Sequence, residues 1–261
     1  MTTIEHRRIR AEDHAQARAQ HLEARAAAGR ALRPQAELKH IAELAATELQ
    51  NATSEEVTAW AAREFGELLA VACSMADAVL PHLVATHAPW VDVLFLDTGC
   101  HFAETVGTRD AVETTLQVNV VDVRPQLTVL EQDSEFGKNL FELDPGACCA
   151  MRKVEPLAAA LGGYEAWVTG VRRDEAPTRA NTPLISWDEK NGLVKINPLA
   201  AWSFDDLLDY ANEHGVVVNP LVNDGYPSIG CAPCTKRVAP GEDPRSGRWA
   251  GLEKIECGLH E

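Results

Sequence analysis

The sequence predicts an α/β protein with an open, mostly parallel sheet and helices on both of its faces. Short apolar runs alternate along the chain with segments in which apolar residues recur at helical spacing. The runs are continuously apolar, as in parallel strands that are buried on both faces. Several of them end directly in Gly, Asp or Thr, which is typical of the loops that follow such strands.

We expect strands over residues 68–72, 91–96, 118–123, 166–169 and 193–196. Helices are expected over 34–51, 53–66, 76–85, from about 100 to 113, over 148–161 and over 203–215. Thr53 with Glu56 forms a capping box, and Ser203 and Gly215 mark the two ends of the last helix. Residues 1–33 are charged and rich in Ala, which indicates a solvated helix or a disordered arm.

Composition excludes several classes of protein. The net charge of −15 argues against a nucleic-acid binder, because such proteins present a basic surface. No apolar run approaches the roughly 20 residues that span a bilayer, and the N-terminus lacks the features of a secretory signal. Seven cysteines cannot all pair within one chain. We therefore expect a cytoplasmic protein with free thiols and no membrane contact.

Two pairs of cysteines suggest a metal site. Cys148 and Cys149 are adjacent, and Cys231 and Cys234 form a C-x-x-C in a loop rich in Pro, Gly and Asn. Four thiolates would suit one zinc ion, whereas an iron–sulfur cluster accommodates adjacent ligands more easily. The alternative is a buried pair of cysteines beside an unrelated C-x-x-C.

A further cysteine, Cys257, lies close to the C-terminus. Its neighbours His260, Lys254 and Arg248 could lower its pKa and make it a nucleophile that moves in and out of a site. Ligands of open α/β sheets bind beyond the carboxyl ends of the strands, so residues 73–77, 97–99 and 169–173 are candidate contacts. The chain has neither G-x-G-x-x-G nor a P-loop, which disfavours the common dinucleotide and triphosphate sites.

From about residue 68 onward the chain resembles the iron–sulfur branch of the PAPS/APS reductases, the assimilatory adenylyl-sulfate reductases. Six segments carry the resemblance, in the same order: Leu96-Asp97-Thr98-Gly99, Cys148-Cys149-Ala150-Met151-Arg152-Lys153, Trp167-Val168-Thr169-Gly170-Val171-Arg172-Arg173, Tyr226-Pro227-Ser228-Ile229-Gly230-Cys231-Ala232-Pro233-Cys234, Arg245-Ser246-Gly247-Arg248-Trp249 and Lys254-Ile255-Glu256-Cys257-Gly258-Leu259-His260. The first sixty or so residues are not covered.

The resemblance implies a sheet like that of the ATP-pyrophosphatases (adenine nucleotide alpha-hydrolases). It also implies a [4Fe-4S] cluster on the two cysteine pairs, and attack by Cys257 on the sulfur of adenosine 5′-phosphosulfate (APS) to give an S-sulfocysteine and AMP. A dithiol then releases sulfite. On this basis we divide the chain into a charged N-terminal arm (1–33), a nucleotide- and cluster-binding α/β domain (34–244) and a flexible catalytic tail (245–261).

Cations inside the matched segments fit the transfer of an anionic group. Lys153, Arg172, Arg245 and Arg248 could screen sulfate and phosphate during attack, with Lys153 between cluster and substrate. His260 could orient the sulfate or lower the pKa of Cys257. Further candidate contacts to the substrate are Ser74, in a loop 72–77 that lacks the glycines of pyrophosphatase relatives, Asp97 and Gly170. We interpret Cys73 and Cys100 as structural thiols.

Three alternatives stay open. Relatives that reduce the 3′-phosphorylated substrate (PAPS) typically lack the four cysteines, which favours APS here. A zinc-stabilised nucleotide-binding module without catalysis is the second alternative, and metal content separates it from the reductase. An ATP-pyrophosphatase is disfavoured by the missing glycines. The electron donor should be a separate protein, thioredoxin, and relatives suggest that the chain forms a homo-oligomer.

Overall fold

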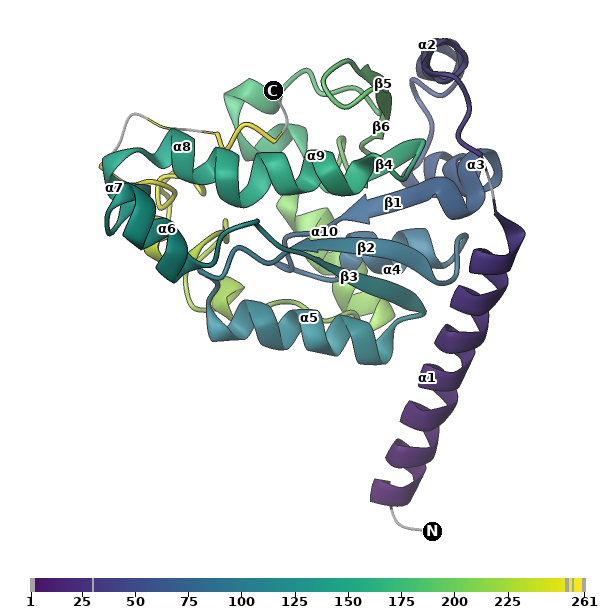
Figure 1. The fold of residues 1–261 in the computed structure, drawn as a ribbon, viewed down its shortest axis with the longest axis horizontal. Coiled ribbons are helices and arrows are strands. Elements are labelled where there is room, and N and C mark those ends of the chain that lie inside the picture. Colours follow the sequence, from purple (N-terminus) through teal and green to yellow (C-terminus); the bar gives the residue numbers. More distant parts are fainter. Residues whose placement is uncertain (1–2, 30, 252–253, 255, 260–261) are drawn as a thin grey trace.

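The fold is built on one sheet, seen nearly edge-on in Figure 1. The computed structural model describes residues 3–29, 31–251, 254 and 256–259. Within them six strands lie in the order β3-β2-β1-β4-β6-β5. Their bounds are Leu69–Ala72 (β1), Val91–Leu96 (β2), Val118–Val123 (β3), Ala166–Thr169 (β4), Ile185–Asp188 (β5) and Leu193–Ile196 (β6). All neighbouring pairs are parallel except β5 with β6, so the predicted open, mostly parallel sheet is confirmed.

Four of the five predicted strands have the predicted bounds, and β1 begins one residue later than expected. The prediction missed β5. This strand reads Ile-Ser-Trp-Asp, and only Ile185 in it is buried. An edge strand with one covered face lacks the continuous apolar run that marked the others.

Helices cover both faces, as predicted. Their bounds are Thr3–Ala28 (α1), Gln35–Glu48 (α2), Ser54–Phe65 (α3), Val79–Ala85 (α4), Ala103–Thr115 (α5), Val129–Phe136 (α6), Leu140–Leu143 (α7), Pro145–Cys149 (α8), Glu155–Leu161 (α9) and Phe204–His214 (α10). In Figure 1, α9 lies over one face of the sheet and α5 over the other. Leu69 and Val71 enter one apolar cluster and Ala70 the opposite one, because successive strand residues point to opposite faces. Both capping predictions hold: Thr53 accepts from the Glu56 amide, and Ser203 from Asp206.

The helix predicted over 148–161 begins earlier and is not uniform. It consists of α8, a π-helical turn over Ala150–Val154, and α9. Asp144 caps α8 by accepting from the Ala147 amide at 2.9 Å. Pro156 has no N–H to donate to the Arg152 carbonyl, which favours a wider turn at this point. The turn follows directly after the two adjacent cysteines.

For the N-terminal extension the sequence left open a helix or a disordered arm, and the structure has a helix, α1. Helix α1 contacts the outer edge of the sheet: Arg18 donates to Asn119 Oδ1 at 2.9 Å and pairs with Glu113 at 2.6 Å. Arg33, after α1, pairs with the buried carboxylate of Glu165 at 2.7 Å. In the part of the chain that the structure describes, no helix is long and apolar enough to cross a membrane.

Candidate active site

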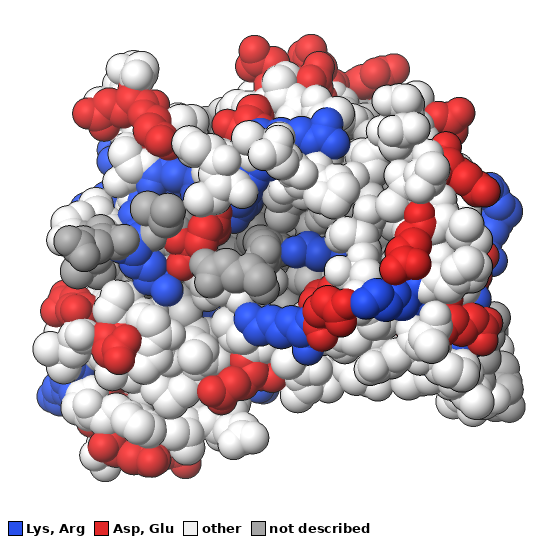
Figure 2. All heavy atoms as spheres, turned by 90° about the horizontal axis from the view of Figure 1, so that it is seen from above, with Lys and Arg blue, Asp and Glu red and all other residues white. Residues whose placement is uncertain are grey.

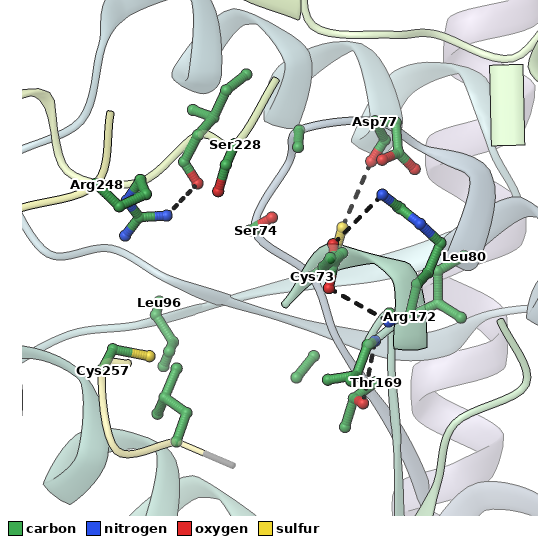
Figure 3. Close-up of a pocket in the computed structure, with 18 of the residues that line it drawn as sticks. Cys73, Ser74, Asp77, Leu80, Leu96, Thr169, Arg172, Ser228, Arg248 and Cys257 are labelled. Atoms are coloured by element: carbon green, nitrogen blue, oxygen red, sulfur yellow. Dashed lines mark hydrogen bonds and ion pairs between the residues drawn. The ribbon is translucent and has the colours of Figure 1, made fainter. Parts of the chain in front are cut away.

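A pocket of about 230 Å³ opens at the carboxyl ends of β1, β2 and β4. This is where open parallel sheets bind ligands, because the loops after neighbouring strands diverge there. Figure 3 shows Arg172 and Asp77 on one side, Arg248 and Ser228 on another, and Cys257 with its sulfur pointing inward. The pocket therefore brings together segments from residue 72 to residue 259.

The loop after β1 contributes Ser74, an exposed side chain that lines the pocket as predicted. The buried Met75 has a left-handed backbone with φ of 60°, a conformation that glycine usually adopts. Asn219 Nδ2 stabilises this turn by donating to the Met75 carbonyl at 3.0 Å. Burial raises the pKa of the Cys73 thiol to about 12, with a smaller contribution from Asp77, which fits its interpretation as a structural thiol.

The chain after β4 contributes Gly170 and Arg172, both in the pocket lining as predicted. Only 8% of Arg172 is exposed, and its guanidinium pairs with Asp174 at 3.2 Å and Glu175 at 3.5 Å. It also lies 5.6 Å from the centre of the Phe204 ring. These contacts fix the direction of the side chain and leave it at the pocket wall, where it can bind an anion.

Arg245 and Arg248, at the start of the C-terminal segment 245–261, line the pocket. The Arg248 guanidinium stacks on the Trp249 ring at 4.6 Å and donates to the Ile229 carbonyl at 3.2 Å. A Cβ at Gly230 would lie 2.2 Å from that guanidinium, so a larger residue there would displace the Arg248 side chain from this position. Among the described residues the buried Nε of Arg248 has no hydrogen-bond partner, and a ligand oxygen would satisfy it.

Cys257 is half-buried and lines the same pocket as the three arginines and Lys153. The preceding Glu256 pairs with Arg179 and Arg245, and Lys190 Nζ donates to the Gly258 carbonyl at 2.9 Å. Leu259 packs against the apolar cluster under α9. These contacts place the thiol at the pocket. The prediction for His260 lies outside the described residues.

Asp97, predicted to contact the substrate, is not among the described residues that line the pocket, although its neighbours Leu96 and Thr98 are. Its carboxylate accepts from the Gly99 amide at 3.1 Å and pairs with Arg124 at 3.2 Å. Asp97 thereby closes the turn after β2.

The two cysteine pairs meet at a second cavity of about 90 Å³, as predicted for one site. Its lining contains Cys148, Cys149, Cys231 and Cys234. A fifth thiol, that of Cys100, lies there too, which the interpretation of this residue as an ordinary structural cysteine did not anticipate.

The thiols of this cavity destabilise one another's ionised forms. Burial, followed by the charge of Cys149, raises the pKa of Cys148 to about 12. Burial and Cys231 raise the pKa of Cys234 to about 11. A bound cationic centre reverses such shifts, because thiolates are the form that binds metal.

The donor set of this cavity is soft. All four cysteines of the two pairs line one cavity. Soft thiolate ligands around such a cavity suit an iron–sulfur cluster.

Three residues, Lys153, Cys231 and Trp249, line both the pocket and the thiol cavity. Burial lowers the pKa of Lys153, but the neighbouring cysteines, Cys231 first, raise it by more, so the net direction is upward. Lys153 therefore stays protonated at neutral pH. It lies where a cation can act on groups in both spaces.

Sequence reasoning missed the residues that support this shared wall. Arg152 is buried and donates to the Thr98 carbonyl at 2.6 Å and to Gln132 Oε1 at 2.9 Å. Thr98 Oγ1 in turn lies 3.3 Å from Cys231 Sγ. His101 lines the pocket and its Nε2 lies 2.9 Å from the Leu96 carbonyl. Thr98 and Arg152 lie in matched segments, but nothing in the sequence indicated that their side chains contact each other.

Charge is unevenly distributed around the site. The chain is acidic overall, with a net charge of −15. Figure 2 looks onto the side of α8 and α9, where Lys and Arg side chains gather around the middle of the face and many Asp and Glu side chains lie nearer its rim. A local group of cations in an acidic protein favours an anionic ligand.

Comparisons with protein families, with individual relatives and with solved structures all point to the same group of reductases. Residues 68–237 match the family described as the phosphoadenosine phosphosulfate reductase domain. The adenosine 5′-phosphosulfate reductases of Mycolicibacterium smegmatis and Streptomyces coelicolor are 62% and 58% identical to this chain, each over 86% of it and 95% of the relative. A phosphoadenylyl-sulfate reductase structure from Candida auris superposes with a TM-score of 0.62 at 26% identity, over 78% of this chain and 98% of the other.

The family match covers all six strands, both cysteine pairs and the residues of the pocket up to Cys231. The fold and the sequence identity agree with it. The chain belongs to the phosphoadenosine phosphosulfate reductase family.

Proposed function

We propose that the protein reduces APS to sulfite and AMP, with thioredoxin as the source of electrons. The observation that carries the proposal is the pocket, which Cys257 lines together with five cationic residues: Lys153, Arg172, Arg245, Arg248 and Arg179, the last of which is paired with Glu175 and Glu256. The relatives named adenosine 5′-phosphosulfate reductases, at 58% and 62% identity, support the choice of substrate.

The reaction would proceed in two steps at Cys257. The Cys257 thiolate attacks the sulfur of the sulfate group, the bond between that sulfur and the bridging phosphate oxygen breaks, and AMP leaves with the bonding electrons. A thiolate of the donor then attacks Cys257 Sγ, and sulfite leaves with the electron pair of the S–S bond. The second donor thiol regenerates the Cys257 thiolate, so the dithiol supplies both electrons.

The cations would act by holding the two anionic parts of the substrate. Charge moves from the thiolate to the leaving phosphate during attack, and fixed cations in a partly closed pocket stabilise this change. Arg172 and Arg248 are suited to phosphate and sulfate oxygens because their guanidinium groups are already oriented by neighbours. The two loops that carry Ser74 and Gly170, after β1 and β4, would bind the nucleoside.

We infer that Cys148, Cys149, Cys231 and Cys234 hold a [4Fe-4S] cluster in the thiol cavity. Such a cluster would order the loop that carries Cys231 and Cys234 and would supply charge next to Lys153. The electron balance at Cys257 is complete without it, so its proposed role is structural and electrostatic. On this proposal residues 245–261 form the catalytic tail.

The test is sulfite formation by protein purified without oxygen, measured with APS and with PAPS in the presence of thioredoxin. We expect APS to be the preferred substrate and AMP and sulfite to appear in equal amounts. Preference for PAPS would reassign the substrate. No turnover of either nucleotide, together with bound zinc and no sulfide, would favour a non-catalytic nucleotide-binding module.

A further inference from the structure

The carboxylate of Glu256, next to Cys257, is held by a segment far away in the sequence. Arg179 donates to it with two parallel hydrogen bonds, from Nε to Oε1 and from Nη2 to Oε2, each 2.8 Å long. Arg245 Nη2 adds a third at 3.1 Å and Thr178 Oγ1 a fourth at 3.2 Å. Both carboxylate oxygens of Glu256 therefore accept hydrogen bonds.

This pair differs from an ordinary surface ion pair. The side chains of Arg179 and Glu256 are only 12% and 11% exposed, and the two-point geometry restricts their relative orientation. Burial raises the pKa of Glu256, but the hydrogen bond and charge of Arg179, and then the charge of Arg245, lower it by more. Both partners are therefore charged at neutral pH.

The same segment lines the substrate pocket with Glu175 and Arg179, and Glu175 also connects it to Arg172. This carboxylate pairs with Arg179 Nη1 at 2.5 Å and with Arg172 Nη2 at 3.5 Å, and it accepts from the Arg172 amide at 3.2 Å. Arg172 lines the pocket. A continuous series of contacts thus joins Arg172, Glu175, Arg179 and Glu256, and it ends one residue before the thiol.

We propose that Arg179 and Glu256 form a latch that holds Cys257 at the pocket, and that Glu175 connects this latch to Arg172. The proposal rests on the proposed function, in which Cys257 attacks the substrate and then meets a dithiol donor. The latch would favour the first step and would have to open for the second. Arg179 lines the pocket, but its guanidinium nitrogens are engaged by Glu175 and Glu256. In this account Arg179 and Glu256 are therefore positioning residues, which act on the reaction through Cys257.

The test compares Glu256→Gln and Arg179→Gln with Glu113→Gln. Glu113 is a matched control because it also pairs with two arginines, Arg18 at 2.6 Å and Arg109 at 3.0 Å, on the opposite side of the sheet from the tail. The first readout is the rate at which iodoacetamide alkylates Cys257 in oxygen-free protein, followed by peptide mass spectrometry. The second is the rate of each half-reaction: S-sulfocysteine formation from APS without donor, and sulfite release when dithiol is added.

We expect alkylation of Cys257 to become about tenfold faster in both latch variants and to stay unchanged in Glu113→Gln. S-Sulfocysteine formation should slow by a similar factor while sulfite release does not slow. The double variant should add little to either single one, because both remove the same interaction. Thr178→Ala, which removes one hydrogen bond, should show a smaller effect in the same direction if a Gln variant fails to fold.

Equal alkylation rates in the wild type and in all latch variants would overturn the latch. Equal slowing of both half-reactions would also overturn it, because a general loss of structure has that effect. Alkylation needs no substrate, so a latch effect in a protein that does not turn over APS would retain the latch and reject the proposed function.

Discussion

The four central strands and the chain after α10 hold their shapes by different forces. Strands β2, β1, β4 and β6 are buried on both faces by apolar side chains, and all four lie within one residue of the bounds that the sequence predicts. The described residues from Asn219 onward form short 3₁₀ turns and one isolated bridge, with no helix longer than one turn and no strand. Many of their contacts are ion pairs, hydrogen bonds and the walls of the thiol cavity, and few of their apolar side chains are buried. The sheet thus presents a stable edge, and the C-terminal region brings reactive groups to it.

The largest loss of activity is expected from replacing the Cys257 thiol, a change that should disturb neither the sheet nor the chain after α10. Cys257→Ser should reduce sulfite formation to background, because oxygen at this position is a much weaker nucleophile than a thiolate. Iron content and APS binding should match the wild type. Sulfite production that survives in this variant would move the chemistry to another residue.

The next effect is confined to the thiol cavity. Cys234→Ser should lose iron and acid-labile sulfide and destabilise the loop of 219–247, because an iron–sulfur site orders the loop that binds it. Cys100→Ser should retain both, since Cys100 lies in the cavity outside the two paired motifs. Metal analysis per chain distinguishes the two variants. Retention of iron by the first and loss by the second would assign Cys100 as a ligand.

A smaller effect is expected from the cations of the substrate pocket. Arg248→Ala should lower kcat/KM for APS by about tenfold to a hundredfold, the range expected for one charge-assisted hydrogen-bonding group. Arg248→Lys should recover only part of this loss because it cannot stack and bind in two places as a guanidinium does. Arg124→Ala is the control, since Arg124 is 69% exposed and lies outside the described pocket lining. Equal losses in both would mean that Arg248 acts only through overall charge.

A substitution far from the site should change the stability of the fold and leave substrate binding and iron content unchanged. Thr53→Ala removes the N-cap of α3 and should lower the free energy of unfolding by about 1 kcal/mol. Denaturant titration measures this change, while KM for APS and iron content should stay at wild-type values. A rise in KM would show that the two regions are coupled more closely than their contacts indicate.

The smallest effect concerns pH. The pKa of Glu256 lies below its ordinary value of 4.5 in the folded protein, because the lowering by Arg179 and Arg245 exceeds the raising by burial. Its contribution to stability is therefore complete above that value and is lost as the pH falls through the lower folded pKa. The stability difference between the wild type and Glu256→Gln should be constant from pH 8 to 6 and should shrink only below about pH 4.5. A difference that changes near pH 7 would implicate another group.

The same division explains what could be predicted from sequence. Buried parallel strands have continuous apolar runs, which made β2, β3, β4 and β6 predictable. A helix cap depends on a few neighbouring residues, which made the cap at Thr53 predictable. The site segments could be recognised by their motifs. The direction of a side chain could not: Asp97 lies in a matched segment yet turns to Gly99 and Arg124. Long-range contacts such as Arg179 with Glu256 have no local signature, because they depend on where two distant loops meet.

The most direct test of the account is a single turnover without donor. Protein purified without oxygen is mixed with APS, AMP is quantified, and the peptide that contains Cys257 is analysed by mass spectrometry. The account predicts one AMP per chain and one SO₃ group on Cys257, removed as sulfite when thioredoxin is added. AMP released with Cys257 unmodified, or an SO₃ group on a different cysteine, would contradict it.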